Sequence, residues 1–243
     1  SMTGMEGFMQ TRSNDAFTVN EMLAVFNEEP FEFEPGTEYA YNNSGYFLLG
    51  ALIEAATGMS YADALQAKLF APLGLDDTGY VDGTVQERMA TGYSRNGLDF
   101  AHARYVHPSV PYAAGMLYAT ASDLHRWNRA LYGGEVFDDP ATLAAMTTPE
   151  GAAADVQYGY GIGAGTQEIG GAERQVYQHS GGIFGFSTQL AYAPEDEVSF
   201  VVLDNAEGNS GAVLMALAQT FYGEEVDLPP QPVRDVLLTT ILE

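Results

Sequence analysis

Two short segments hold the side chains best suited to chemistry. Tyr41 and Asn43 lie two residues apart, and His179–Gly182 follows far downstream. A phenol has a pKa near ~10, so a tyrosine becomes a useful base only when nearby cations lower that pKa. A neutral imidazole binds anions poorly at pH 7. A glycine in a strand, such as Gly181, lets a ligand lie close to the backbone.

A long apolar helix must position the first segment. The sequence predicts a helix over Ser44–Thr57, closed by Gly58 in the left-handed conformation that glycine tolerates best. Apolar residues cover nearly its whole circumference, with Glu54 as its one charge. Such a helix is expected to be buried inside the fold. It would hold Asn43 in a fixed place at its N-terminus.

Further helices are indicated by capping residues. A helix over Val19–Asn27 is capped by Thr18, and one over Ala121–Tyr132 is capped by Thr120. Ser60 begins a short helix that runs to Phe70 and is stopped by Pro72. Asp139-Pro140 opens another, with proline in its preferred first turn.

After Gly151 the apolar pattern changes from helical to alternating. Strands are expected at Tyr158–Ile169, Glu173–His179, Phe184–Ala193 and Val198–Leu203, followed by a helix over Ser210–Tyr222. Helices first and an antiparallel sheet with a closing helix second indicate an α+β fold. We therefore expect a helical region at 1–150, a sheet region at 151–223, and a tail or linker at 224–243.

The composition excludes several classes of function. The net charge of −24 repels phosphate backbones, so we expect no nucleic-acid partner. Two explanations of this charge are open: an adaptation for solubility or salt tolerance, and a surface that recruits cations or basic partners. The chain has no cysteine, which removes thiol catalysis and cysteine metal sites. No run approaches the ~18–20 apolar residues of a membrane span.

Five motifs in order resemble the serine β-lactamase and penicillin-binding-protein superfamily, and class C β-lactamases and family VIII-like esterases in particular. They are Phe33–Gly58, Pro72–Thr78, Ala114–Leu124, Tyr158–Gly161 and His179–Phe186. Any one motif is weak, but five in order over most of the chain make a strong resemblance. It implies a β-lactamase/transpeptidase-like fold, no cofactor and no metal.

The resemblance assigns roles to the candidate residues. Tyr41 would be the general acid/base, and Asn43 would hold a substrate amide oxygen or orient the family's lysine. His179, Ser180 and Gly181 would form the pocket strand where the family has Lys-Thr-Gly or His-x-Gly. The N–H of Gly182 would supply half of an oxyanion hole. Histidine in place of lysine favours esters or short peptides over β-lactams.

Simpler structural roles remain open for the same residues. Tyr41 could be a buried aromatic with a satisfied hydroxyl, Asn43 a helix N-cap, and His179 a strand-end histidine. Ser44 is expected to be a helix cap rather than a nucleophile. Ser180 cannot easily pair with its neighbour His179, because adjacent strand residues point to opposite faces.

Two further features concern other kinds of chemistry. No Gly-x-Ser-x-Gly elbow occurs, which argues against the α/β-hydrolase mechanism. His102 and His107, with Asp99 nearby, could suggest a metal site. Their five-residue spacing in a loop without further ligands argues against one.

The family's nucleophile motif, Ser-x-x-Lys, does not occur in these residues. The single lysine is Lys68, and Leu65 stands three residues before it. Three accounts compete: a fragment of a longer hydrolase, a chain completed by a separate N-terminal piece, and a non-catalytic binding or scaffold module. We expect the chain alone to be inactive. An open sheet edge would favour a dimer or a complementing N-terminal segment. By resemblance, a periplasmic or secreted location is expected.

Overall fold

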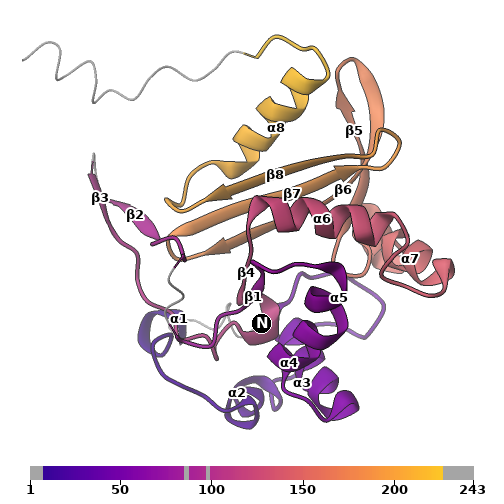
Figure 1. Ribbon diagram of the computed structural model, residues 1–243. Helices are drawn as coiled ribbons and strands as arrows, with labels where there is room; N and C mark the ends of the chain where they lie inside the picture. The colour runs from indigo at the N-terminus through magenta and orange to yellow at the C-terminus, as the bar shows by residue number, and fades with distance from the viewer. Residues whose placement is uncertain (1–7, 85–87, 97–98, 227–243) are drawn as a thin grey trace, which may run out of the picture.

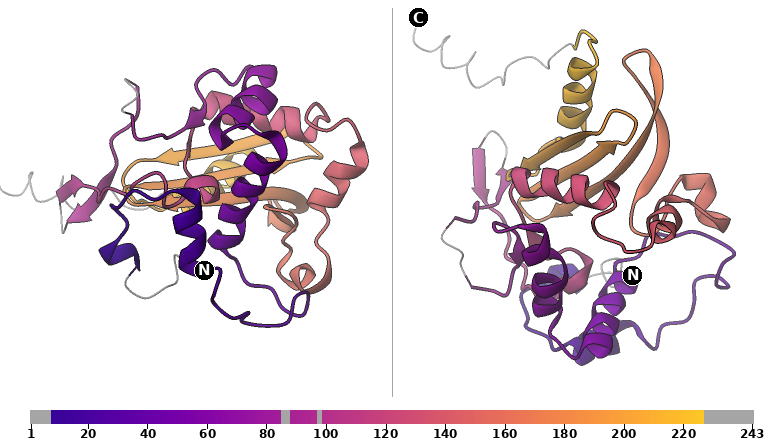
Figure 2. Two further views of the ribbon diagram at one scale, coloured as in Figure 1. Left: turned by 90° about the horizontal axis from the view of Figure 1, so that it is seen from below. Right: turned by 45° about the vertical axis from the view of Figure 1, so that its right-hand side comes forward.

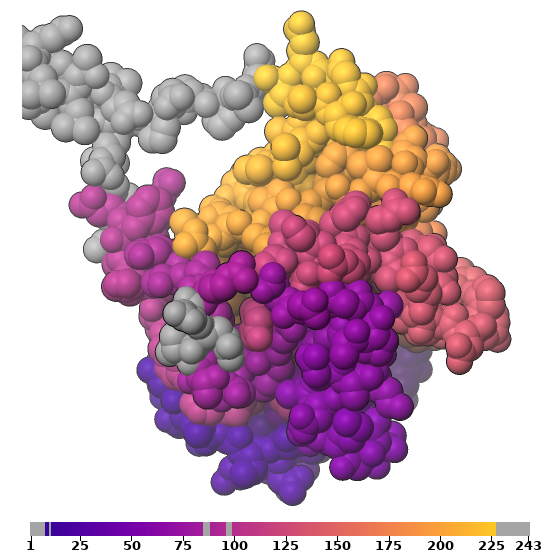
Figure 3. Space-filling view, in the orientation of Figure 1, coloured from indigo at the N-terminus to yellow at the C-terminus, as the bar shows by residue number. Residues whose placement is uncertain are grey.

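A four-stranded antiparallel sheet carries helices on both faces and lies beside a group of helices from the first part of the chain (Figure 1). The computed structural model describes residues 8–84, 88–96 and 99–226. Figure 3 shows the sheet and its last helix in orange and gold above the pink and purple helices. The order of elements confirms the expected α+β arrangement.

The helices begin and end close to their capping residues. The helices are α1 (Phe8–Thr11), α2 (Val19–Phe26), α3 (Asn43–Thr57), α4 (Tyr61–Leu65), α5 (Ala71–Leu73), α6 (Ala121–Tyr132), α7 (Pro140–Thr147) and α8 (Ser210–Phe221). A π-helical turn, η2 (Gln66–Phe70), joins α4 to α5, and two 3₁₀ turns are η3 (Tyr112–Ala114) and η4 (Gly151–Val156). Thr18, Ser60, Thr120 and Asp139 act as the N-caps expected from the sequence.

The strands form one sheet and two small pairs. The sheet has the order β5 (Gly163–Ile169), β6 (Ala172–Ile183), β7 (Phe186–Ala193) and β8 (Val198–Asp204). The pairs are β1 (Gly79–Tyr80) with β4 (Leu117–Tyr118), and β2 (Tyr93–Asn96) with β3 (Asp99–His102). The sequence did not predict these pairs. They lie within or beside the segment 81–110, which carries no strong alternation.

Alternation along the strands assigns α6 and α8 to opposite faces of the sheet (Figures 1 and 2). Val176 and Ala191 belong to the core under α8. Their chain neighbours Tyr177 and Tyr192 instead stack with Tyr132 of α6, with ring centroids 4.9 and 4.6 Å apart. The sheet is therefore covered on both sides, which fixes its register strongly.

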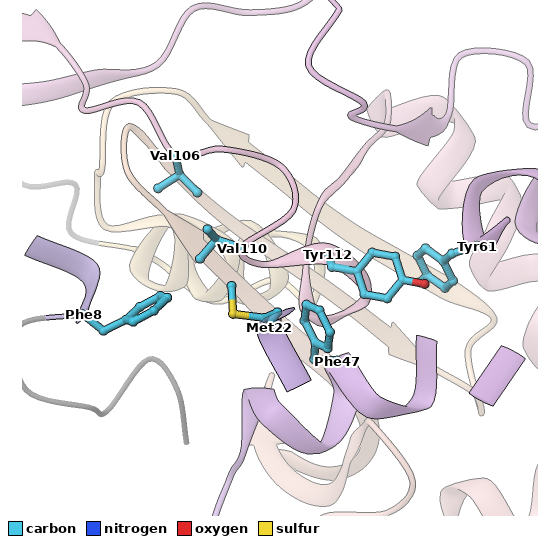
Figure 4. Close-up of a cluster of buried hydrophobic side chains, with 7 residues drawn as sticks. All are labelled: Phe8, Met22, Phe47, Tyr61, Val106, Val110 and Tyr112. Carbon is cyan, nitrogen blue, oxygen red and sulfur yellow. The ribbon is translucent and has the colours of Figure 1, made fainter. Parts of the chain in front are cut away.

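A second core lies among the first helices and holds α3 in place. Its seven buried side chains are Phe8, Met22, Phe47, Tyr61, Val106, Val110 and Tyr112 (Figure 4). Phe47 of α3 packs on Tyr112, with ring centroids 4.8 Å apart. Since α3 begins at Asn43, this packing also determines where the first candidate segment lies.

Two expectations about the helices were wrong. Pro72 does not stop the helix that begins at Ser60, because the π turn that precedes it widens the backbone ladder and lets the helix continue to Leu73. The helix α3 is not buried all round. It buries one face around Phe47, while Leu48, Leu49, Leu52 and Ile53 are between 36% and 54% exposed.

A second exposed apolar stripe follows one side of α8. Val213, Leu217 and Phe221 recur every four residues and are about half exposed. The neighbouring strand β8 pairs with β7 on one side, and on its other side no described strand pairs with it. Within the described residues, no helix combines the length and apolarity needed to cross a membrane. The expected tail at 224–243 lies mostly outside the described residues.

Candidate active site

The fold brings Tyr41 and His179 together from opposite ends of the chain. Tyr41 lies just before α3, and His179 lies in β6. Their ring centroids are 6.0 Å apart. Tyr41 is 52% exposed, so it is not the buried aromatic of the simpler alternative. The two predicted segments therefore meet at one place, which the resemblance implied and the spacing alone could not show.

Asn43 is the first residue of α3 rather than its cap. Asn42 caps the helix, since its side-chain oxygen accepts a hydrogen bond from the N–H of Gly45 at 3.1 Å. Asn43 instead lines a cavity. Ser44 is buried in the first turn and is not the expected cap. The N-cap alternative for Asn43 and the cap role for Ser44 were both wrong, because the cap is the earlier residue Asn42.

A cavity of about 540 Å³ lies between α3 and β6. Asn43 of α3 and Gly182 of β6 both line it, as does the carboxylate residue Glu207. Glu207 accepts hydrogen bonds from the N–H of Gly185 at 2.7 Å and from the hydroxyl of Ser94 at 3.0 Å. Tyr41 and His179 are not among the lining residues. The cavity and the aromatic pair are linked through the chain, because Asn43 follows Tyr41 by two residues and Gly182 follows His179 by three.

The backbone of β6 lacks a described strand partner on one side at Ser180 and Gly182, although the main-chain oxygen of Ser180 lies 2.7 Å from Nδ1 of His179. Two-residue turns join β6 to β5 and to β7, and the pairs that close them are Ile169 with Ala172 and Ile183 with Phe186. The two residues of such a closing pair hydrogen-bond each other, and along the strands hydrogen-bonded pairs then alternate with non-hydrogen-bonded pairs. Both turns direct the N–H and C=O of Ser180 and Gly182 toward the β5 side. Because β5 begins at Gly163, opposite Gln178, no strand of the described sheet pairs with these groups.

Gly181 and Gly182 differ in their surroundings. A methyl group added to Gly181 would meet the hydroxyl oxygen of Thr188 on β7. One added to Gly182 would meet nothing within 4 Å. The absence of a side chain at Gly181 therefore leaves room for Thr188 across the sheet, and its expected place beside a ligand stays a prediction. Gly182 is the position that leaves space beside the cavity.

Tyr158 is a site residue whose contact sequence reasoning missed. Its hydroxyl lies 2.9 Å from Nε2 of His179, and its ring centroid is 6.2 Å from that of Tyr41. The sequence marked it only as part of the Tyr158–Gly161 motif. No local signal reveals a contact between residues so far apart in the chain.

Three phenols around this site, those of Tyr39, Tyr46 and Tyr158, have raised pKa values. Burial, chiefly, and the neighbouring phenols raise the pKa of Tyr158 well above its ordinary value. Burial also raises the pKa values of Tyr39 and Tyr46. No described arginine or lysine lowers these pKa values. A cation would have to come from elsewhere to make a phenolate here.

The histidines of the segment 81–110 have ordinary structural contacts. Nδ1 of His107 lies 2.8 Å from the hydroxyl of Ser109, and the ring of His102 stacks on Tyr93. Among residues 8–84, 88–96 and 99–226, no three histidine, aspartate or glutamate side chains gather as metal ligands. The metal candidate at His102 and His107 gains no further ligand from the fold.

Comparison with known proteins gives consistent matches. The chain is 28% identical to penicillin-binding protein 4* of Bacillus subtilis over 218 residues, covering 82% of this chain and 48% of that protein. It is 27% identical to a D-aminopeptidase of Brucella ovis, covering 83% of this chain and 38% of that protein. The chain thus spans half or less of the length of these relatives.

Solved structures and family comparison agree with this result. A D-stereospecific amidohydrolase from Streptomyces superimposes with a TM-score of 0.72 at 25% identity, over 88% of this chain and 64% of that one. The Beta-lactamase family matches residues 3–222. With its fold and its motifs in the same order, this chain belongs to the Beta-lactamase family.

Proposed function

We propose that this chain supplies the Tyr41, Asn43 and His179 part of a serine hydrolase site that cleaves ester or amide bonds through an acyl-enzyme. The nucleophile would come from a segment outside these 243 residues. The observation that carries the proposal is the convergence of α3 and β6. Tyr41 meets His179 at 6.0 Å between ring centroids, and Asn43 and Gly182 line one cavity.

The geometry supports a division of labour between these residues. A serine hydroxyl from the added segment would attack the carbonyl carbon, and its proton would pass to Tyr41 and then to the leaving group. The N–H of Gly182 and that of the nucleophile would bind the oxyanion. Water would then release the acyl group and restore the serine. Tyr41 requires a cation to act as a base, which the lysine of a Ser-x-x-Lys motif would supply.

The surroundings favour substrates without a carboxylate at this strand. His179 stands where a lysine would otherwise bind an anion, and the cavity is lined by the carboxylate of Glu207. A neutral imidazole and a nearby carboxylate both disfavour an anionic group. We propose small esters, amides or short peptides as substrates, in keeping with the D-aminopeptidase and amidohydrolase among the matched proteins.

A non-catalytic binding or scaffold module is the second candidate. It is favoured by one observation, the absence of Ser-x-x-Lys from the 243 residues. Such a module would keep the strand β6 and the cavity for recognition without turnover. It would bind ester or peptidoglycan-like ligands reversibly and form no adduct.

Covalent labelling distinguishes these candidates. The chain alone, and the product of the reading frame extended upstream, are treated with a fluorophosphonate probe and a fluorescent penicillin, and adducts are mapped by mass spectrometry. We expect no adduct on the chain alone and one on an upstream serine of the extended protein. An adduct on a serine within residues 1–243 would contradict the proposal. The absence of any adduct on the extended protein would favour the binding module.

A further inference from the structure

Both ring nitrogens of His179 have partners within the protein. Nδ1 lies 2.7 Å from the main-chain oxygen of Ser180. Nε2 lies 2.9 Å from the hydroxyl of Tyr158. A histidine in this setting has no nitrogen left for a ligand unless one of these two bonds breaks.

The chemistry of the two partners determines where the proton lies. A main-chain carbonyl oxygen can only accept a hydrogen bond, so Nδ1 of His179 must carry a proton. In a neutral imidazole the other nitrogen is then an acceptor. The hydroxyl of Tyr158 also hydrogen-bonds the phenol of Tyr46, so its single proton points either to that phenol or to Nε2 of His179. Donation to Nε2, with Tyr46 donating to the oxygen of Tyr158, satisfies both ring nitrogens of His179 in a single neutral tautomer.

The backbone holds Tyr158 firmly against His179. The N–H of Tyr158 donates to the carbonyl of Ala153 at 3.1 Å. The next residue, Gly159, donates to the carbonyl of Ile162 at 2.8 Å and lies so close to the carbonyl of Met146 that a side chain could not fit. The turn after Tyr158 is therefore fixed on both sides, which holds the backbone that carries the phenol beside the histidine.

We propose that Tyr158 is a positioning residue that, together with the carbonyl of Ser180, holds His179 as a neutral imidazole protonated on Nδ1. The ring then offers a ligand neither a charge nor a free hydrogen-bonding nitrogen. The consequence for a ligand rests on the proposed function: the N–H of Ser180 and the main-chain groups of Gly182, rather than the imidazole, would bind it on this strand. The tautomer itself does not depend on that function.

Tyr160 provides a matched control for Tyr158. It lies two residues away in the same motif, and its side chain is 69% exposed. Tyr160→Phe removes one hydroxyl from the same motif, as Tyr158→Phe does, but it leaves the bond between Tyr158 and His179 in place. A neutral hydrogen bond of this kind biases a two-state equilibrium by up to roughly tenfold, so the loss of the Tyr158 hydroxyl should be visible in the tautomer populations.

The experiment is nitrogen NMR of the chain labelled with ¹⁵N-histidine, with the His179 signals assigned by their loss in His179→Gln. We expect a single neutral tautomer protonated on Nδ1 in the wild type and in Tyr160→Phe. In Tyr158→Phe we expect the Nε2 resonance to move toward that of an unbonded acceptor and a population protonated on Nε2 to appear.

Two results would overturn the inference. One is a wild-type ring protonated on Nε2, which decides the matter whether or not a variant folds. The other is a folded Tyr158→Phe whose His179 signals equal those of the wild type. Because the measurement needs no turnover, failed labelling of the extended protein would leave the inference intact, and a wrong tautomer would leave the acyl-enzyme proposal intact.

Discussion

Substitution of two adjacent glycines in β6 provides a stringent test of the site geometry. We expect Gly181→Ala to lower the free energy of unfolding and Gly182→Ala to leave it nearly unchanged. The reason is that a methyl group at Gly181 would meet the hydroxyl oxygen of Thr188, whereas one at Gly182 would meet nothing within 4 Å. Neither glycine has a positive φ, so alanine fits the backbone at both positions.

The magnitude follows from what the added methyl group meets. Forcing an extra methyl group into a packed site costs ~1–3 kcal/mol. Thr188 can turn about its side-chain bond, so we expect about 1 kcal/mol for Gly181→Ala, at the low end of that range. This corresponds to a fall in Tm of roughly 2–4 °C for a chain of this size. Gly182→Ala should stay within about 0.5 kcal/mol of the wild type.

Urea and thermal unfolding of both variants measure these values. A second substitution, Thr188→Ala, removes the group that the new methyl would meet, so Gly181→Ala should cost little in that background. Such a cycle isolates the coupling between the two residues. Equal destabilisation by the two glycine substitutions would refute the reasoning, as would an unchanged cost of Gly181→Ala in the Thr188→Ala background.

Substitutions at three other residues test the packing and electrostatics of the fold. Buried Asp123 accepts three hydrogen bonds, from the N–H of Asp77, the hydroxyl of Thr78 and, at 3.4 Å, the guanidinium of Arg126. Asp123→Ala should therefore cost about 3 kcal/mol and Asp123→Asn about half of that, measured by urea unfolding; equal costs would contradict this. Burial and a hydrogen bond to Asp196 raise the pKa of Tyr222 to about 12. An unfolded tyrosine loses its proton near pH ~10, so stability should be full below that pH and fall as the pH rises to about 12. Unfolding at pH values of about 9 and 11 should show a smaller fall for Tyr222→Phe than for the wild type; an equal fall would be inconsistent with a shifted pKa. Leu52→Gln on the exposed side of α3 should change stability by less than about 0.5 kcal/mol and reduce self-association in sedimentation; a large loss of stability would mean that this face is packed.

Helix ends were the most predictable feature because their causes are local. Thr18 and Thr120 accept hydrogen bonds from main-chain N–H groups of their own first turns, and Gly58 closes α3 with a φ of 68°. These interactions involve neighbours within four residues, so the sequence alone contains them. The four strands of the main sheet were predicted for a similar reason, since the alternation of side chains and the Gly170–Gly171 turn are local patterns, but β5 begins at Gly163 rather than at the expected Tyr158.

Burial and long-range contacts could not be predicted in the same way. The apolar circumference of α3 indicated a fully buried helix, but burial depends on what packs against each face, and one side of α3 remains exposed around Leu52. The small pairs β1–β4 and β2–β3 lie outside any strong alternation. The contact between Tyr158 and His179 depends on the turn at Gly159 and on the position of β6, so no spacing rule reveals it.

The residues of the candidate site were nominated by resemblance rather than by local physics. Tyr41 and His179 are unremarkable as single residues, and their meeting at 6.0 Å follows from the packing of α3 and β6. Asn42, not Asn43, caps α3. The sequence-based prediction missed this cap because it began the helix one residue late, at Ser44. The catalytic roles of Tyr41, Asn43 and His179 stay predictions.

The acylation rate of the upstream-extended protein carrying Tyr41→Phe tests the central claim most directly. A positioned general acid/base contributes about 10²–10⁴-fold to such a step, so the rate of adduct formation with a fluorescent penicillin or a chromogenic ester should fall by that factor. The mapped serine should stay the same, and Tyr160→Phe should react at the wild-type rate. A Tyr41→Phe protein that acylates as fast as the wild type would contradict the role of this tyrosine and the account built on it.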